Sequence, residues 1–187
     1  MPIISIKEIL HLILMTAALG YIFSGFIRPA LSHIQLHLPK FNWKEFKFAI
    51  LISAPAVVLH ELAHKLIAIL FGLTAEFQAS FFGLGIGVFL RIINSPFIIF
   101  APGYVSISST ADPLTLAVIA FAGPFTNLVL WLGSSLILSR ARHLTRKQAL
   151  ILYLTKRINM ILFIFNMLPI PPFDGSKVFL GLINAIF

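Results

Sequence analysis

Two histidines and a glutamate interrupt an apolar stretch of the chain, and their spacing suits metal chemistry. The segment reads His60-Glu61-Leu62-Ala63-His64. On a helix, residues four positions apart project from the same face about one turn apart, so the two imidazoles can share a ligand. In this arrangement the histidines hold zinc and the carboxylate between them activates a water molecule. The competing interpretation is that the three polar side chains pair with one another inside a helix bundle.

The composition of the chain places this motif in a membrane. Of the 187 residues, 59% are hydrophobic and 11% are charged, whereas soluble domains carry about 25% charged residues. Ionisable groups at membrane depth are costly, which favours a functional role for the motif. The net charge of +8 comes from 14 Lys and Arg against six acidic residues. Because the basic residues mostly flank apolar runs, this charge indicates membrane topology and not a nucleic-acid partner.

A third metal ligand has to come from elsewhere in the chain. Catalytic zinc has three protein ligands and one open position, and the absence of cysteine leaves only His, Asp and Glu. Glu8 and Glu45 lie at span boundaries near basic residues, as solvated charges do, and Asp112 precedes a proline, which indicates a turn or helix N-cap. Asp174 follows three prolines and precedes a glycine. Irregular backbone at membrane depth can line a cavity, but a turn leaving the bilayer explains this pattern equally well.

Four apolar runs predict transmembrane helices, since about 20 residues cross the hydrocarbon core. These runs cover residues 9–27, 48–71, 114–139 and 150–169. The first run also contains a small-x-small sequence, Ala18-Leu19-Gly20, that is typical of a signal-peptide cleavage site. Its apolar character continues to Ile27, which favours a retained span.

The remaining segments complete the expected fold. Residues 73–109 are apolar but interrupted by glycine and proline, and residues 32–38 and 103–109 alternate as half-buried strands do. Residues 176–187 are too few to cross a bilayer and predict a short helix. We therefore expect one integral-membrane domain over residues 1–187. It is mainly α-helical, with four main transmembrane helices, a short C-terminal helix and membrane-associated β-hairpin or re-entrant segments.

Three motifs together resemble those of a known family and occur in the family's order. They are His60-Glu61-x-x-His64, Gly123-Pro124-x-x-Asn127 and Asn166-x-x-Pro169-x-Pro171-x-x-Asp174-Gly175. From residue 48 onward the chain resembles the site-2 protease family of intramembrane zinc metalloproteases. We expect a minimal form, without the PDZ or CBS domains of many members. Phe173 stands where the family often has leucine, a conservative packing change.

The resemblance implies both an activity and a set of site residues. The activity is hydrolysis of peptide bonds within or near transmembrane segments, in regulated intramembrane proteolysis. The alternative is a non-proteolytic metal-binding scaffold or transporter that reuses the fold. The implied site consists of His60, His64 and Asp174 as ligands of one catalytic Zn²⁺, Glu61 as the catalytic base, Asn166 as an oxyanion or substrate contact, and Asn127 lining the same region.

The expected partners are a transmembrane protein substrate and the lipid bilayer, for a multi-pass protein of unknown oligomeric state in the plasma membrane of a prokaryote. A substrate helix must be unwound before cleavage, and a strand edge could hold it by β-addition. The two alternating segments are therefore either substrate clamps or scaffold. Two arguments on orientation disagree. The basic loops 28–47 and 140–157 predict an external N-terminus by the positive-inside rule, whereas the resemblance implies a cytosolic one.

Overall fold

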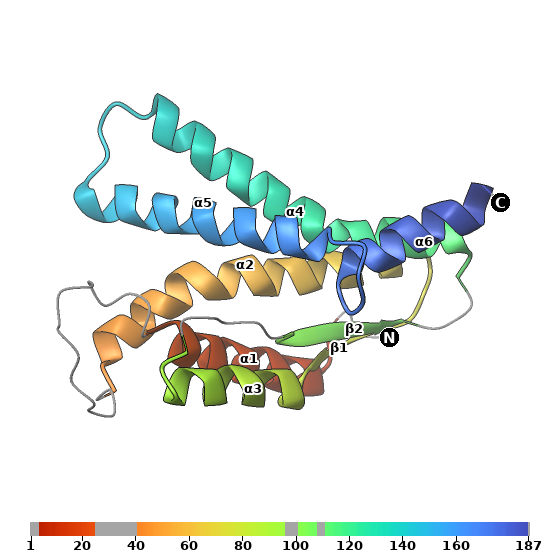
Figure 1. Ribbon diagram of the computed structural model, residues 1–187, viewed down its shortest axis with the longest axis horizontal. Coiled ribbons are helices and arrows are strands. Elements are labelled where there is room, and N and C mark those ends of the chain that lie inside the picture. Colours follow the sequence, from red (N-terminus) through yellow and green to blue (C-terminus); the bar gives the residue numbers. More distant parts are fainter. Residues whose placement is uncertain (1–3, 25–40, 96–100, 108–110, 187) are drawn as a thin grey trace. The chain divides into compact units, whose positions relative to one another are not determined.

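The computed structural model describes residues 4–24, 41–95, 101–107 and 111–186. Within these residues the chain forms six helices and two short strands (Figure 1). In chain order the elements are α1 (Ile6–Ser24), α2 (Trp43–Leu70), β1 (Ala75–Ala79), α3 (Phe81–Ile92), β2 (Gly103–Ile107), α4 (Pro113–Arg140), α5 (Arg146–Asn166) and α6 (Asp174–Ile186). The mainly helical fold with a short C-terminal helix, predicted from the sequence, is confirmed.

Four of the described helices are long and apolar enough to cross a membrane, namely α1, α2, α4 and α5. They match the four predicted spans, with ends that differ by a few residues. Large apolar side chains such as Leu132 and Leu136 of α4 are exposed on their surfaces. Lipid tails are as apolar as these side chains, so this exposure is compatible with a bilayer and not with water. The protein is therefore a multi-pass membrane protein.

The fourth helix, α4, begins where the sequence indicated an N-cap. Asp112 accepts a hydrogen bond from the backbone N–H of Thr115 at 2.9 Å, and Pro113 occupies the first turn. Both choices are favourable at a helix start, where backbone N–H groups lack partners within the helix. The interpretation of Asp112 as an N-cap is confirmed. The next helix, α5, begins with a capping box formed by Thr145 and Gln148.

The segment between α2 and α4 contains the predicted β-structure and one helix that was not predicted. Strands β1 and β2 form an antiparallel pair, the one sheet in the described residues. Between them lies α3, a helix of 12 residues, which is about 18 Å long and too short to cross about 30 Å of hydrocarbon. Its glycines obscured the helix in the sequence. Gly83 is required by packing, because a Cβ there would lie 1.8 Å from the carbonyl oxygen of Ala101. The alternating segment 32–38 lies outside the described residues.

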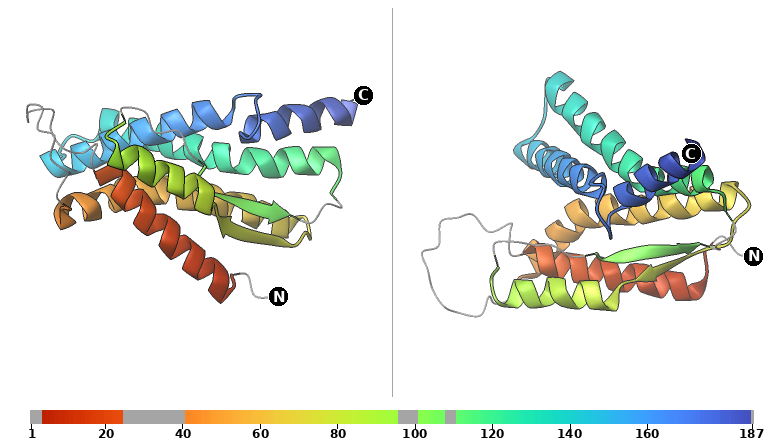
Figure 2. Two further views of the ribbon diagram at one scale, coloured as in Figure 1. Left: turned by 60° about the horizontal axis from the view of Figure 1, so that its bottom comes forward. Right: turned by 45° about the vertical axis from the view of Figure 1, so that its right-hand side comes forward.

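The chain divides into two compact units, residues 1–58 with 77–104 and residues 59–76 with 105–187. Within the first unit, α1 lies beside α3 (Figure 2). Within the second, α4 packs against both α5 and α6. Gly181 of α6 permits a close approach, since a Cβ there would lie 2.5 Å from the carbonyl oxygen of Pro113. The single domain over residues 1–187 stays a prediction.

Glu8 differs from its sequence-based interpretation as a solvated charge. Glu8 is only 3% exposed. One carboxylate oxygen accepts the N–H of Ser5 at 2.8 Å, and the other accepts the N–H of Phe77 in β1, also at 2.8 Å. One turn along α1, Nδ1 of His11 accepts the N–H of Ala79 at 3.4 Å. Two side chains of α1 therefore bind alternate N–H groups along one edge of β1, which explains why the carboxylate is buried.

Candidate metal centre

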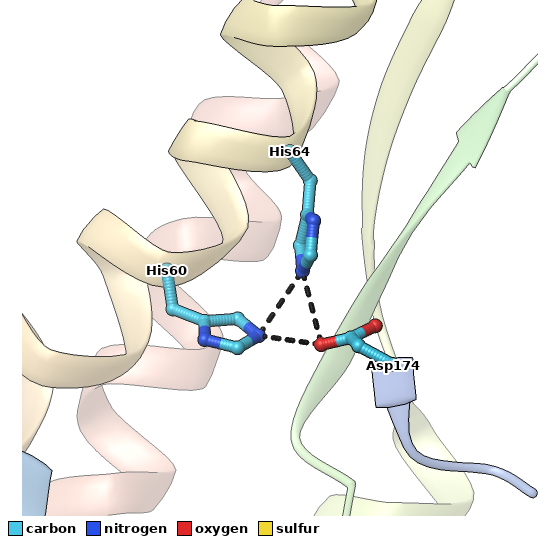
Figure 3. A group of neighbouring side chains, drawn as sticks. All are labelled: His60, His64 and Asp174. Atoms are coloured by element: carbon cyan, nitrogen blue, oxygen red, sulfur yellow. Dashed lines mark hydrogen bonds and ion pairs between the residues drawn. The ribbon is translucent and has the colours of Figure 1, made fainter. Parts of the chain in front are cut away.

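The histidines of the HExxH motif meet a carboxylate that is distant in the sequence. His60 and His64 project from α2, and Asp174 is the first residue of α6, so that all three side chains point toward one another (Figure 3). Oδ2 of Asp174 lies 3.1 Å from Nε2 of His60 and 3.2 Å from Nε2 of His64. The two Nε2 atoms lie 3.1 Å apart. The three residues belong to the same compact unit, and the structure brings them together as the resemblance implied.

The proline-rich segment before α6 positions the carboxylate of Asp174. After α5 ends at Asn166, the backbone turns, with a hydrogen bond from the N–H of Phe173 to the carbonyl of Ile170. The helix α6 then starts against the end of α5. Gly175 is needed there, because a Cβ would lie 2.5 Å from the carbonyl carbon of Met167. The sequence left a turn and a cavity-lining site as alternatives. The structure shows the turn and places Asp174 beside the two histidines, and the role of Asp174 as a ligand stays a prediction.

The other nitrogen of each imidazole is held by a hydrogen-bond acceptor. Nδ1 of His64 lies 2.8 Å from the carbonyl oxygen of Ile119, and Nδ1 of His60 lies 2.6 Å from Oδ1 of Asn127. Each Nδ1 therefore acts as a hydrogen-bond donor, and in the neutral form of each ring the lone pair is on Nε2. In that form the cluster presents two nitrogen lone pairs and a carboxylate oxygen to one another. Such facing acceptors repel one another unless a proton or a metal cation lies among them.

The donor set and its spacing fit zinc. Zinc binds histidine nitrogen and carboxylate oxygen at about 2.0–2.2 Å in tetrahedral geometry, which separates two ligand atoms by about 3.3–3.6 Å. The observed separations of 3.1–3.2 Å are slightly shorter than this range and close to its lower end. Gly123 of α4 keeps the space beside the nitrogens open, because a Cβ there would lie 2.3 Å from Nε2 of His64 and 2.6 Å from Nε2 of His60. The residues present are therefore suited to hold the ion.

The cluster is shielded from the surroundings. His60 and His64 are each 7% exposed, Glu61 is 6% exposed, and Asp174 is half-buried. The polar atoms of the cluster are therefore largely removed from water.

Two asparagines connect His60 to the neighbouring helices. Asn127 of α4 is fully buried, and its Nδ2 donates to Oδ1 of Asn159 in α5 at 2.9 Å. Asn159 is also fully buried and donates from its own Nδ2 to the carbonyl of Thr155 at 2.8 Å. Asn159 was not among the site residues predicted from the sequence. Its signal was available, since an asparagine inside an apolar span needs a polar partner.

Asn166 lies half-buried at the end of α5. Among the described residues, the side-chain hydrogen bonds of the two histidines go to Asn127, Ile119, Asp174 and each other. The structure thus brings Asn127, and not Asn166, into hydrogen-bond contact with them. The roles of Asn166 as an oxyanion or substrate contact, and of Asn127 in lining the substrate region, stay predictions.

Helices of membrane-spanning length and a buried His-His-Asp cluster beside a glutamate define the class of a membrane-embedded metallopeptidase. Comparison with known proteins agrees. The model of peptidase family M50 matches residues 47–141 and 132–187. The chain belongs to peptidase family M50, the family of the site-2 proteases, and the resemblance seen in the sequence is confirmed.

Two relatives of the chain are described as zinc metalloproteases. A "putative zinc metalloprotease" of Methanocaldococcus jannaschii is 33% identical over 177 residues, which cover 92% of this chain and 83% of the relative. A second "putative zinc metalloprotease", from Synechocystis sp., is 30% identical over 138 residues, which cover 74% of this chain and 31% of that protein. No solved structure matches the chain significantly. Together with the family, these relatives identify zinc as the cofactor.

Proposed function

We propose that the protein is an intramembrane zinc endopeptidase that cleaves membrane proteins within or near their transmembrane segments, in regulated intramembrane proteolysis. The observation that carries the proposal is the convergence of Nε2 of His60, Nε2 of His64 and Oδ2 of Asp174 to within 3.2 Å of one another beside helices of membrane-spanning length. The protein acts as a single membrane domain in the plasma membrane of a prokaryotic cell.

Each residue of the cluster has a separate role in this proposal. His60, His64 and Asp174 hold one zinc ion. Bound there, the ion would polarise the scissile carbonyl and lower the pKa of a water molecule to about 7. Glu61 accepts the proton of the attacking water and passes it to the leaving nitrogen. Glu61 is buried, which keeps its carboxylate away from bulk solvent.

The amide side chains complete the site. Asn166 donates a hydrogen bond to the developing oxyanion or to the substrate, a role whose removal typically lowers the rate about 100-fold or more. Asn127 lines the same region through its contact with His60. The substrate is held in extended form, because a helix has its carbonyls bonded internally and offers no accessible amide.

Two single substitutions test the proposal by separating the base from the ligands. Glu61→Gln should retain stoichiometric zinc and abolish cleavage of a single-span membrane substrate. Asp174→Ala should lose both, with a zinc affinity reduced by more than the roughly 100-fold typical of an outer partner. Zinc content and cleavage are measured on the purified full-length protein. Cleavage by Glu61→Gln would mean that the base lies elsewhere. A wild type that binds zinc but cleaves nothing would favour the metal-binding scaffold or transporter.

A further inference from the structure

A directional chain of hydrogen bonds leads from the backbone of α5 to the ring of His60. The carbonyl oxygen of Thr155 accepts from Nδ2 of Asn159 at 2.8 Å, and Oδ1 of Asn159 accepts from Nδ2 of Asn127 at 2.9 Å. Oδ1 of Asn127 lies 2.6 Å from Nδ1 of His60. Both asparagines are 0% exposed, so water does not compete for these bonds.

The carbonyl group of Thr155 fixes the direction of every hydrogen bond in this series. A backbone carbonyl can only accept, so Asn159 has to turn its NH₂ group toward Thr155 and its oxygen toward Asn127. Asn127 must then present its NH₂ group to Asn159 and its oxygen to His60. Nδ1 of His60 is left with the role of donor, and in the neutral ring the lone pair is then on Nε2, the nitrogen that faces Asp174 and His64.

His64 differs from His60 because its Nδ1 is bonded to the backbone carbonyl of Ile119 and not to an amide side chain. A backbone carbonyl can only accept, so no second residue is needed to fix the direction of this hydrogen bond. An asparagine amide, by contrast, can turn by 180° and exchange its oxygen for its nitrogen. If Asn127 turned, it would offer a donor to Nδ1 of His60. The ring would then carry its proton on Nε2, inside the acceptor cluster.

We infer that Asn159 is a positioning residue for metal binding. It locks the amide of Asn127 and thereby holds His60 in the tautomer whose Nε2 can bind the ion. The inference rests on the proposed function, in that His60 is a ligand. Outer partners of metal-binding histidines typically change metal affinity by about 10- to 100-fold when removed, and Asn159 acts at one further step.

The test is a double-mutant cycle in the full-length protein, with zinc affinity measured by chelator competition. Asn159→Leu should weaken zinc binding by about tenfold or more, because the NH₂ group of Asn127 then loses the acceptor Oδ1 of Asn159 that favours its orientation. In an Asn127→Asp background, the same Asn159→Leu substitution should change the affinity by about twofold or less. A carboxylate accepts from His60 through either oxygen, so its orientation no longer needs Asn159.

Ser134→Ala is the matched control. Ser134 is also buried in α4, but its hydroxyl donates to the carbonyl of Leu130 in its own helix, so this variant should keep wild-type zinc affinity. Equal losses on Asn159→Leu in the two backgrounds would show that Asn159 acts only by packing and would overturn the inference. So would an unchanged affinity in Asn159→Leu alone.

A spectroscopic measurement keeps the inference testable if the double variant fails to fold. Cobalt substituted for zinc should show altered visible absorption in Asn159→Leu and an unaltered spectrum in Ser134→Ala. Identical spectra in Asn159→Leu and wild type would overturn the inference. A wild type that binds neither metal would contradict the proposed function itself, and this result is distinct from any difference between the variants.

Discussion

Buried ionisable side chains occur in both compact units, but they are satisfied in opposite ways. In the first unit, each carboxylate oxygen of Glu8 accepts a backbone N–H, from Ser5 and from Phe77. In the second unit, His60, His64 and Asp174 direct three acceptor atoms at one another. Both groups are largely removed from solvent, so burial alone does not distinguish them.

The balance of donors and acceptors does distinguish the two regions. Glu8 obtains its donors from the backbone and thereby joins α1 to the edge of β1, which is a structural role. At α2 and α6 the facing atoms are two imidazole nitrogens and a carboxylate oxygen, a set of groups that can hold a metal cation. A costly ionisable group at membrane depth indicates function by default, and this comparison adds the condition that its hydrogen bonds are not already complete.

The largest effect that would test this difference is expected at Gly123, where the cluster has room for a cation. Gly123→Ala should abolish zinc binding and cleavage, because the new Cβ would lie 2.3 Å from Nε2 of His64. Gly133→Ala in the same helix is the matched control. Nothing lies within 4 Å of a Cβ there, and alanine favours the helix by up to about 1 kcal/mol. Full zinc content in Gly123→Ala would show that this space is not the metal site.

The backbone N–H groups of β1 and β2 give a second comparison. One edge of β1 pairs with β2, and α1 binds the N–H groups of Phe77 and Ala79 on its other edge. The N–H of Ser80 donates to the carbonyl of Pro102, so alternation along the antiparallel pair directs the N–H of Val105 away from β1. We propose that the outer edge of β2 receives the extended substrate by β-addition.

An intermediate effect is expected from blocking that edge. Val105→Pro should lower cleavage by up to about tenfold, since one hydrogen bond contributes about 0.5–1.5 kcal/mol. Zinc content should not change. Val105→Ala retains the N–H and should cleave as the wild type does, which separates the backbone effect from the loss of the side chain. If Val105→Pro cleaves normally, β2 is a scaffold and not a substrate clamp.

These contrasts follow what a local sequence pattern can encode. The spacing of His60 and His64 along one helix, and the position of Asp112 before a proline, depend on neighbouring residues and were readable directly. Asp174 lies 114 positions from His60, and its pairing required the family resemblance. The Glu8–Phe77 and Asn127–Asn159 contacts span 69 and 32 positions. Such contacts are created by the packing of elements that are distant in the sequence. The local pattern can indicate that an asparagine in an apolar span needs a polar partner, but it does not identify that partner.

The smallest effect is expected from Glu8, and it concerns stability alone. Glu8→Ala removes the acceptor for the N–H groups of Ser5 and Phe77, and an unsatisfied buried donor costs about 1–3 kcal/mol. The free energy of unfolding in detergent should fall by about this amount, while zinc affinity and the cleavage rate of the folded protein stay at wild-type values. Glu45→Ala is the matched control, because Glu45 is the first-turn acid of α2 and accepts from the exposed side chain of Asn42. Glu45→Ala should lower the free energy of unfolding by less than Glu8→Ala does. Loss of zinc or cleavage in a stably folded Glu8→Ala variant would show that a fully hydrogen-bonded carboxylate also serves the reaction, and the distinction between the two regions would fail.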